Sequence, residues 1–203
     1  MSVLTYKTIL KPSEEVLYKD KGSKFYGYAF PLKTIEEYKK IIEKLKQKHS
    51  SAGHFCFAYQ HGIETLYHRA SDDGEPSNSA GLPIYGQLQA FDVTNVLVVV
   101  VRYFGGTKLG VGGLISAYKT TAKLSLEASD IKTLDILITF KLNFEYKDLS
   151  QVMRIIKKQQ LVIKSQRLEM ECEVVVLVKK SGKKSLQTTF EAFHKIKVEI
   201  LND

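Results

Sequence analysis

The stretch NVLVVVVRYF, residues 95–104, constrains the fold of this chain more than any other feature. Its apolar residues are consecutive and do not alternate with polar ones, so we expect a strand that is covered on both faces. A glycine-rich loop follows, and residues 113–129 show a helical pattern. A strand, a glycine loop and a helix in this order can bind phosphate, because backbone N–H groups at the start of a helix favour anions.

The glycine loop matches neither standard phosphate-binding fingerprint. Lys108 follows Thr107 where the P-loop has a glycine, and Ile115 stands where the dinucleotide fingerprint needs its third glycine. For the glycines alone we favour a structural role, since glycine allows positive φ and close packing of a strand against a helix. The loop and the residues before it are still the best binding candidates: Arg102, Tyr103, Phe104, Gly105, Gly106, Lys108 and Gly110.

An acidic segment, SDDGEPS, places Asp72, Asp73 and Glu75 within four residues. These carboxylates could bind Mg²⁺ or pair with Arg102 or Lys108. Their spacing matches no defined metal loop, whereas Asp-Gly and Pro-Ser are typical of turns. We therefore expect a turn with an ion pair, and no metal or cofactor. We count the three acidic residues among the binding candidates.

The bulk properties are those of a water-soluble protein with a basic balance. The formal net charge is +8, and 44% of the residues are hydrophobic. No apolar run reaches the length of a membrane span, the N-terminus lacks a secretory pattern, and there are only two cysteines. We expect a cytoplasmic protein without membrane contact. The basic balance permits RNA binding, and the absence of a nucleophile motif favours a protein that is not an enzyme.

The order of the expected elements indicates two domains. Up to residue 129 the pattern gives strands at 3–10, 16–31, 54–60, 65–70 and 95–104, with helices at 34–49, 84–92 and 113–129. Thr34 and Glu37 form a capping-box pattern at the first of these helices. A long strand at 134–146 then opens a β-α-β-β-α-β order, the ferredoxin-like motif, with Asp148 as the cap of its first helix. We expect domains at 1–131 and 132–203.

Three blocks carry a resemblance to a known family: GSKFYGYAFP (22–31), HRASDDGEPSNSAGLPI (68–84) and NVLVVVVRYFGGTKLGVGGLISAY (95–118). Together they resemble the bacterial, YigZ-type branch of the IMPACT family. The family's His-His-Cys pattern reads His54-Phe55-Cys56 here, and Asn78-Ser79 and Ser116 also depart from it. The resemblance implies an α+β chain with two domains. The first would be an α/β fold like ribosomal-protein domain 2 and domain IV of elongation factor G, and the second would resemble that factor's ferredoxin-like domain V.

The resemblance also implies a role in translation, because the family's eukaryotic relatives regulate translation through protein contacts. We expect a non-enzymatic regulatory protein whose partner is RNA, the ribosome or another protein. Lys24, Lys108 and Lys119 would meet phosphates together with Arg102, and Tyr103 and Phe104 would stack on bases. The alternative is a phosphate- or nucleotide-binding protein, including a magnesium-dependent enzyme, that uses the glycine loop and the acidic segment.

Overall fold

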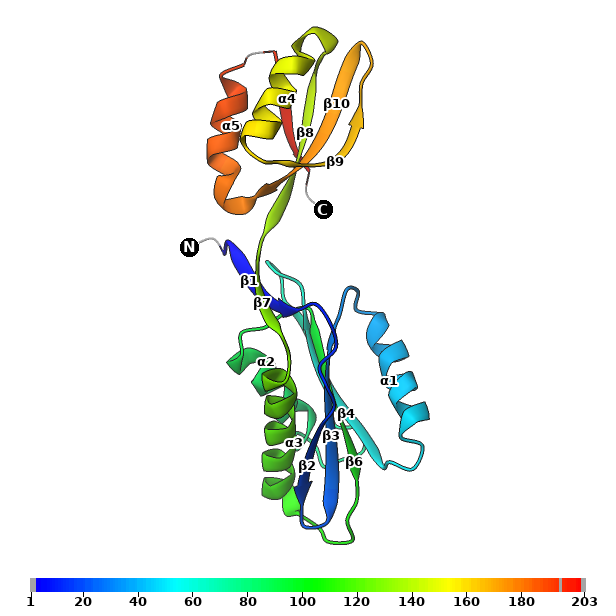
Figure 1. Ribbon diagram of the computed structural model, residues 1–203. Helices are drawn as coiled ribbons and strands as arrows, with labels where there is room; N and C mark the ends of the chain where they lie inside the picture. The colour runs from blue at the N-terminus through cyan, green and yellow to red at the C-terminus, as the bar shows by residue number, and fades with distance from the viewer. Residues whose placement is uncertain (1–2, 194, 202–203) are drawn as a thin grey trace. The chain divides into compact units, whose positions relative to one another are not determined.

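The computed structural model describes residues 3–193 and 195–201. The chain divides into an N-terminal unit, Tyr6–Leu134, and a C-terminal unit that comprises the rest of the described chain. Both units combine helices with antiparallel sheets, so the fold class is α+β (Figure 1). None of the helices among the described residues combines the length and the apolar character needed to cross a bilayer.

A five-stranded antiparallel sheet forms the centre of the N-terminal unit, with β6 in the middle. In spatial order the strands are β2 (Val16–Asp20), β3 (Ser23–Pro31), β6 (Val96–Tyr103), β4 (His54–His61) and β5 (Tyr67–Ser71). A separate two-stranded sheet joins β1 (Thr5–Ile9) to β7 (Ile131–Asp135). The central place of β6 explains its uniformly apolar sequence, because it has strand neighbours on both sides and covered faces above and below.

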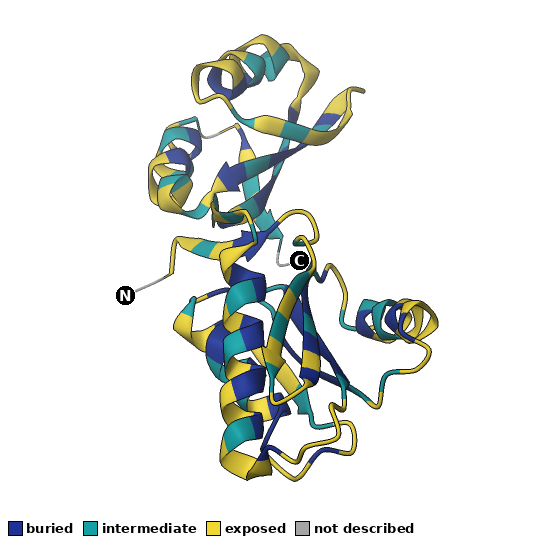
Figure 2. Ribbon diagram, turned by 60° about the horizontal axis from the view of Figure 1, so that its bottom comes forward, coloured by how far each residue is buried: buried dark blue, intermediate teal, exposed yellow. Residues whose placement is uncertain are grey.

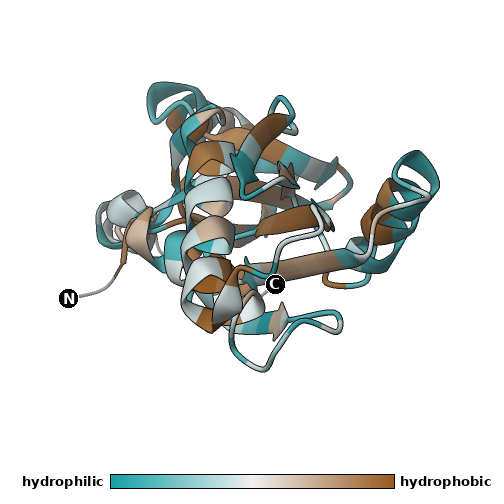
Figure 3. Cartoon of the chain, turned by 90° about the horizontal axis from the view of Figure 1, so that it is seen from below, coloured by the Kyte–Doolittle hydropathy of each residue, from teal (hydrophilic) through white to brown (hydrophobic). Residues whose placement is uncertain are grey.

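Helices cover both faces of this sheet. One core packs α2 (Gly81–Ala90) and α3 (Gly110–Glu127) against Val96, Val98 and Val100. The other packs α1 (Glu37–Lys48) against Leu97, Val99 and Val101, so β6 contributes to both cores. Figure 2 shows the central strands in dark blue, and Figure 3 shows them as brown, apolar ribbon between the helices. The expectation that this strand is covered on both faces is confirmed.

The buried face of α3 is made of small residues, as its sequence predicts, and this allows close packing on β3. The residues expected on that face are all buried: Leu114, Ala117, Tyr118, Thr121, Ala122 and Ser125. A Cβ placed on Gly27 of β3 would lie 2.3 Å from the Ser125 hydroxyl oxygen and 2.7 Å from the Thr121 methyl. Glycine is therefore required where α3 crosses this strand.

Two helix starts differ from the sequence prediction. The helix α1 begins at Glu37, later than expected, and no side chain caps it, so the predicted Thr34–Glu37 capping box is wrong. The Glu37 carboxylate instead accepts a hydrogen bond from the backbone N–H of Lys33. The helix α2 begins at Gly81, earlier than the expected residue 84. The acidic segment supplies its cap, a long-range contact that the local pattern does not contain.

The C-terminal unit has the β-α-β-β-α-β order that the sequence predicts. Its elements are β8 (Leu137–Glu145), α4 (Leu149–Lys158), β9 (Val162–Arg167), β10 (Glu171–Lys179), α5 (Lys183–Glu191) and β11 (Lys197–Leu201), with short 3-10 turns before each helix. The sheet order β11-β8-β10-β9, antiparallel throughout, is that of the ferredoxin-like motif. Its core is formed by residues such as Phe140, Val176 and Phe190.

The start of this unit also departs from expectation in two details. The single strand predicted at 134–146 is two strands, because Ile136 interrupts it between β7 and β8. Asp148 takes the N-cap position of α4 but its side chain makes no capping hydrogen bond, so that expected cap is wrong.

Candidate functional site

The glycine loop leaves the end of β6 and packs directly on the β2–β3 turn. A Cβ placed on Gly105 would lie 1.9 Å from the carbonyl carbon of Gly22, closer than any side chain can approach. The Gly105 N–H donates a hydrogen bond of 3.2 Å to the Ser23 hydroxyl. Gly106 and Gly110 have φ of 85° and 74°, which non-glycine residues rarely adopt. The structural role expected for these glycines is confirmed.

A buried ion pair lies beneath the loop. The Arg102 guanidinium contacts the Glu75 carboxylate at 2.6 Å, and the two side chains are 6% and 4% exposed. The Tyr118 hydroxyl donates a hydrogen bond of 2.7 Å to the same carboxylate oxygen. Glu75 therefore has two donors, and the acidic segment and the strand before the glycine loop meet in space. The ion pair that we preferred over a metal site is confirmed for Glu75 and Arg102.

The remaining contacts of Arg102 fix its guanidinium inside the protein. Its second terminal nitrogen lies 3.4 Å from the Ser23 hydroxyl, which also receives the Gly105 N–H. The guanidinium carbon also lies over two aromatic rings, 5.5 Å from the centre of Phe25 and 5.6 Å from that of Phe104. Arg102 is therefore positioned to hold the loop, and its guanidinium does not face solvent where a phosphate would bind.

Asp72 and Asp73 bind backbone groups. The Asp72 carboxylate accepts hydrogen bonds from the N–H groups of Ala80 and Gly81 at the start of α2, at 2.9 and 2.8 Å. The Asp73 carboxylate accepts one from the Phe55 N–H at 2.6 Å. Among the described residues no group of three or more histidine, cysteine or acidic side chains is arranged to hold a metal ion. These contacts explain why three acidic residues lie so close together in sequence.

Burial changes the acidity of the groups around the ion pair. Burial, and then the neighbouring Cys56 and Glu75, raise the pKa of Tyr118, so its hydroxyl stays protonated and can donate to Glu75. Burial also raises the pKa of Cys56, whose thiol contacts the Asp72 carbonyl oxygen at 2.9 Å. A protonated, buried thiol is a poor nucleophile. The site thus holds no activated cysteine, in agreement with the departure from the family pattern beside it.

Tyr103 lies on the opposite face of the sheet from Arg102 and belongs to a second polar cluster. Its hydroxyl is 3.0 Å from Nδ1 of His49, and Nε2 of His49 is 2.6 Å from the Tyr28 hydroxyl. The Tyr28 hydroxyl donates to the Glu15 carboxylate at 2.5 Å, and Lys48 pairs with the same carboxylate. The sheet therefore separates Tyr103 from Arg102, although they are adjacent in sequence.

The Glu15 carboxylate decides which group donates in each of these hydrogen bonds. The Lys48 ammonium, and then the Tyr28 hydroxyl, lower the pKa of Glu15, so it is an ionised acceptor. Tyr28 donates to it and accepts from His49 Nε2–H, which leaves Nδ1 to accept from the Tyr103 hydroxyl. Burial, and then Lys48, lower the pKa of His49, in agreement with this neutral form. Tyr103 is thus held by a hydrogen bond that points into the protein.

The exposed binding candidates form two groups. Phe104 and Lys108 of the loop are exposed, and Lys24 of β3 is paired in register with Tyr103, so its exposed side chain begins beside the loop. Gly106 and Gly110 leave open space where a side chain would be. Lys119 is also exposed but lies about 13 Å along α3 from the start of that helix. The structure therefore places Lys24, Phe104 and Lys108 at the same end of the sheet, with Lys24 on the face that carries Tyr103 and Phe104 beside Arg102, and Lys119 is separate.

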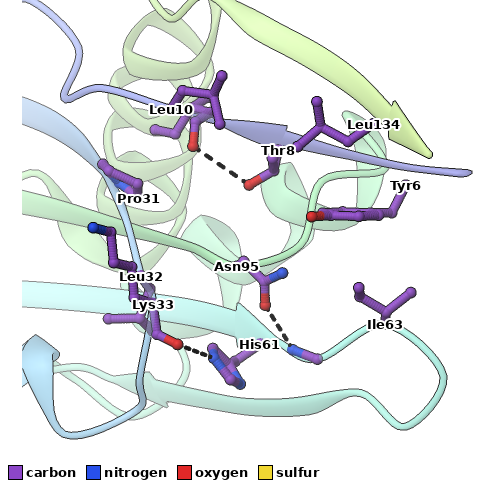
Figure 4. Close-up of a pocket in the computed structure, with 12 residues that line it drawn as sticks. Tyr6, Thr8, Leu10, Pro31, Leu32, Lys33, His61, Ile63, Asn95 and Leu134 are labelled. Carbon is purple, nitrogen blue, oxygen red and sulfur yellow. Dashed lines mark hydrogen bonds between the residues drawn. The ribbon is translucent and has the colours of Figure 1, made fainter. Parts of the chain in front are cut away.

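A second concave region lies at the other end of the same sheet, near the start of β6. This cavity has a volume of about 460 Å³ and mainly apolar walls, among them Ile9, Leu32 and Leu134 (Figure 4). The Asn95 side-chain oxygen accepts the Gly62 N–H at 2.9 Å. The His61 ring nitrogen donates to the Lys33 carbonyl oxygen at 3.1 Å, so these polar atoms already have partners within the fold.

Sequence reasoning did not identify several residues of the two clusters: Ser23, Tyr118, Glu15, Tyr28 and His49. The sequence contained one indication of Tyr118, because it is the only aromatic residue on the small-residue face of α3. The sequence contained no indication of His49, since its hydrogen-bond partners come from segments far apart in the chain.

The fold and site together define a two-unit α+β protein with an exposed basic and aromatic loop held over a buried ion pair. A family model described as the Impact N-terminal domain matches residues 21–126. An "IMPACT family member" of Haemophilus influenzae is 34% identical over 190 residues, which cover 91% of this chain and 88% of that protein. The chain belongs to the IMPACT family.

Two solved structures add comparisons of the fold. A crystal structure of a hypothetical protein covers all of both chains with a TM-score of 0.73 and 24% identity, a likeness that concerns the fold alone. The structure of the two-domain translational regulator Yih1 matches 59% of this chain and 46% of that chain, with 27% identity and a TM-score of 0.40.

Proposed function

We propose that this protein regulates translation, without catalysis, by binding RNA or the ribosome through the exposed end of its N-terminal unit. Membership of the IMPACT family supports the role in translation, because the family resemblance implies it. The likeness of the two units to domains IV and V of elongation factor G, and a cytoplasmic location, are parts of the same proposal.

The observation that carries this proposal is that Lys24, Phe104 and Lys108 are all exposed at the same end of the sheet. The two lysines offer positive charge to phosphates, and Phe104 is 57% exposed and offers an aromatic face to a base. The loop that carries two of them is fixed by Gly105 and by the buried Arg102. A loop backbone held in place by packing lowers the entropic cost of binding, because less of the chain has to be ordered when the partner binds.

The test is binding of the whole chain to purified ribosomes and to labelled single-stranded RNA over a series of salt concentrations. We expect the triple variant Lys24→Ala, Phe104→Ala, Lys108→Ala to bind about tenfold more weakly at low salt, with a shallower salt dependence. The triple variant Lys39→Gln, Lys40→Gln, Lys44→Gln, on exposed positions of α1, is the control. Equal binding by wild type and the loop variant would show that this end does not contact RNA.

A protein partner is the second candidate, and the exposed apolar residues near the loop favour it. Phe104 and Val111 are 57% and 53% exposed, and protein interfaces bury such residues at their centres. A partner recovered after nuclease treatment, and no longer recovered with Phe104→Ala, would support this candidate. The magnesium-dependent alternative gains nothing from the structure, since Asp72, Asp73 and Glu75 already have partners.

A further inference from the structure

The two helices of the C-terminal unit expose a group of cations that has no counter-charge among the described residues. The α4 sequence contains three basic residues and no carboxylate, and α5 begins with two lysines. We call this group the α4–α5 cations: Arg154, Lys157, Lys158, Lys183 and Lys184. All five are exposed, and none forms an ion pair with a described residue. Elsewhere in the unit, in contrast, Lys141, Lys147 and Lys179 each pair with a carboxylate.

The α4–α5 cations lie on the same side of the C-terminal sheet, because both helices pack on one face of that sheet (Figure 1). A groove of about 290 Å³ runs between the helices and is lined by Arg154 and Lys158 of α4 and Thr189 of α5. Gln151 and Gln159 also line it, together with the apolar Ile155 and Phe193. The groove therefore combines positive charge with hydrogen-bond donors, the groups that bind phosphate oxygens.

The helix dipole explains only part of this charge. Lys157 and Lys158 lie in the last turn of α4, where the dipole favours cations. Lys183 and Lys184 lie in the first turn of α5, where the dipole opposes them. Two adjacent cations at this position lower the stability of the free protein and would be stabilised by a bound polyanion.

The surface chemistry distinguishes between nucleic acid and protein as the polyanion. The exposed large apolar residues include Phe104, Val162 and Met170, but among the described residues none lies on α4 or α5. A protein interface needs an apolar centre, whereas a phosphate backbone is bound by charge and polar donors alone. Within the described part of the chain the two helices also expose no aromatic side chain on which an unpaired base could stack, and Phe193, which follows α5 and lines the groove, is half-buried.

We propose that the α4–α5 cations bind the phosphate backbone of double-helical RNA without reading its sequence. The choice of RNA over DNA rests on the proposed role in translation. The choice of a duplex backbone rests on the charge and on the lack of an exposed aromatic side chain on the two helices. This surface is separate in sequence from the glycine loop and belongs to the other unit of the chain.

The test uses the full-length chain, a labelled RNA duplex and fluorescence anisotropy over a series of salt concentrations. The variant Arg154→Gln, Lys157→Gln, Lys158→Gln should bind the duplex at least about tenfold more weakly at low salt. Its slope of log K against log salt should be shallower by about 2 to 3, close to one unit for each phosphate that the variant no longer neutralises. The second variant, Lys183→Gln, Lys184→Gln, should act in the same direction. Far-UV circular dichroism checks that both variants are folded, as their exposed positions lead us to expect.

The control is the α1 variant Lys39→Gln, Lys40→Gln, Lys44→Gln, which removes the same net charge as the α4 variant from another exposed helix. It should leave the slope unchanged. An equal weakening in the control would overturn the proposal, because binding would then follow net charge alone. Competition by polyglutamate as strong as that by the duplex would also overturn it and would indicate an acidic protein.

The glycine-loop variant measured in parallel separates this proposal from the proposed function. If the loop variant no longer binds ribosomes and the α4–α5 variants bind the duplex as wild type does, the further inference fails and the proposed function stands. If the loop variant binds normally and only the α4–α5 variants bind the duplex weakly, the assignment to the loop fails and the α4–α5 surface stands. Duplex DNA bound as tightly as duplex RNA would refute the choice of RNA.

Discussion

Gly105 and Gly22 pack backbone to backbone where the loop after β6 crosses the β2–β3 turn, and a Cβ on Gly105 would lie 1.9 Å from Gly22. We expect Gly105→Ala to lower the free energy of unfolding by about 1 to 3 kcal/mol, because the methyl group must displace backbone atoms. Gly112→Ala is the matched control: it lies in α3 with open space around it and should be neutral or stabilising. Urea unfolding of both variants measures the difference, and equal stabilities would contradict the packing.

The Arg102–Glu75 pair predicts a large coupling energy. Glu75→Ala leaves a guanidinium that is 6% exposed without its counter-charge, and we expect a loss of about 3 to 5 kcal/mol. The double variant Glu75→Ala, Arg102→Met should lose less than the sum of the single variants. Glu127→Ala breaks the exposed pair with Lys123 and should cost less than about 1 kcal/mol. Denaturant unfolding of the four variants provides the comparison, and additive losses would show that the buried pair is not coupled.

Asp72 predicts a specific loss of stability at the start of α2. Asp72→Ala removes the acceptor for the N–H groups of Ala80 and Gly81, and we expect a loss of about 1 to 2 kcal/mol. Added Mg²⁺ should leave the melting temperature of the wild-type protein unchanged, because Asp72 is already bound to the backbone. A clear rise in melting temperature with Mg²⁺ would instead favour the metal-dependent alternative.

His49 predicts a dependence of stability on pH. Burial, and then Lys48, lower its pKa below the ordinary value of 6.5, so the unfolded chain binds the proton more strongly than the folded chain. The contribution of neutral His49 to the free energy of unfolding is therefore fully present above pH 6.5. It is lost as the pH falls through the pKa of His49 in the folded protein. The pKa of Glu15 is also lowered, so protonation of Glu15 lowers the free energy of unfolding only below its ordinary pKa of 4.5. Between pH 6.5 and 4.5 the change in stability is therefore assigned to His49.

The measurement is urea unfolding of wild type and His49→Phe at several pH values within that range. The wild-type protein should lose stability as the pH falls, and the variant should show a smaller change although it is less stable at neutral pH. Parallel curves for the two proteins would assign the pH dependence to another group.

Much of the fold could be predicted from local patterns. The continuous apolar run of β6 predicted a covered strand, and the small residues of α3 predicted the face that packs on it. The element order of the C-terminal unit was also correct, because hydrophobic periodicity is a local property. The start of α2 could not be predicted locally, because Asp72 accepts hydrogen bonds from N–H groups eight and nine residues further along the chain. Two local predictions also failed, since neither Thr34 nor Asp148 caps its helix.

The candidate site shows the same division. The sequence identified the glycine loop, the acidic segment and the basic residues beside the loop as binding candidates, without showing whether the loop and the acidic segment meet in space. It favoured an ion pair over a metal for the acidic segment and left Arg102 and Lys108 open as the partner. The sheet register decides this: it places Arg102 on the face that carries Glu75 and Tyr118. Tyr103, one residue later, points to the other face, because side chains alternate along a strand.

The amino-acid sequence by itself determined the type and order of most elements, the covered central strand and the need for glycine after it, because these follow from hydrophobic period and backbone sterics. Only the tertiary structure decided which charges are consumed inside the fold and which remain for a partner. Arg102 and Glu75 neutralise each other out of reach of solvent, while Lys24, Lys108 and the α4–α5 cations remain exposed. The physical reason is distance: Coulomb attraction and desolvation depend on the positions of charges in space, and chain folding sets those positions.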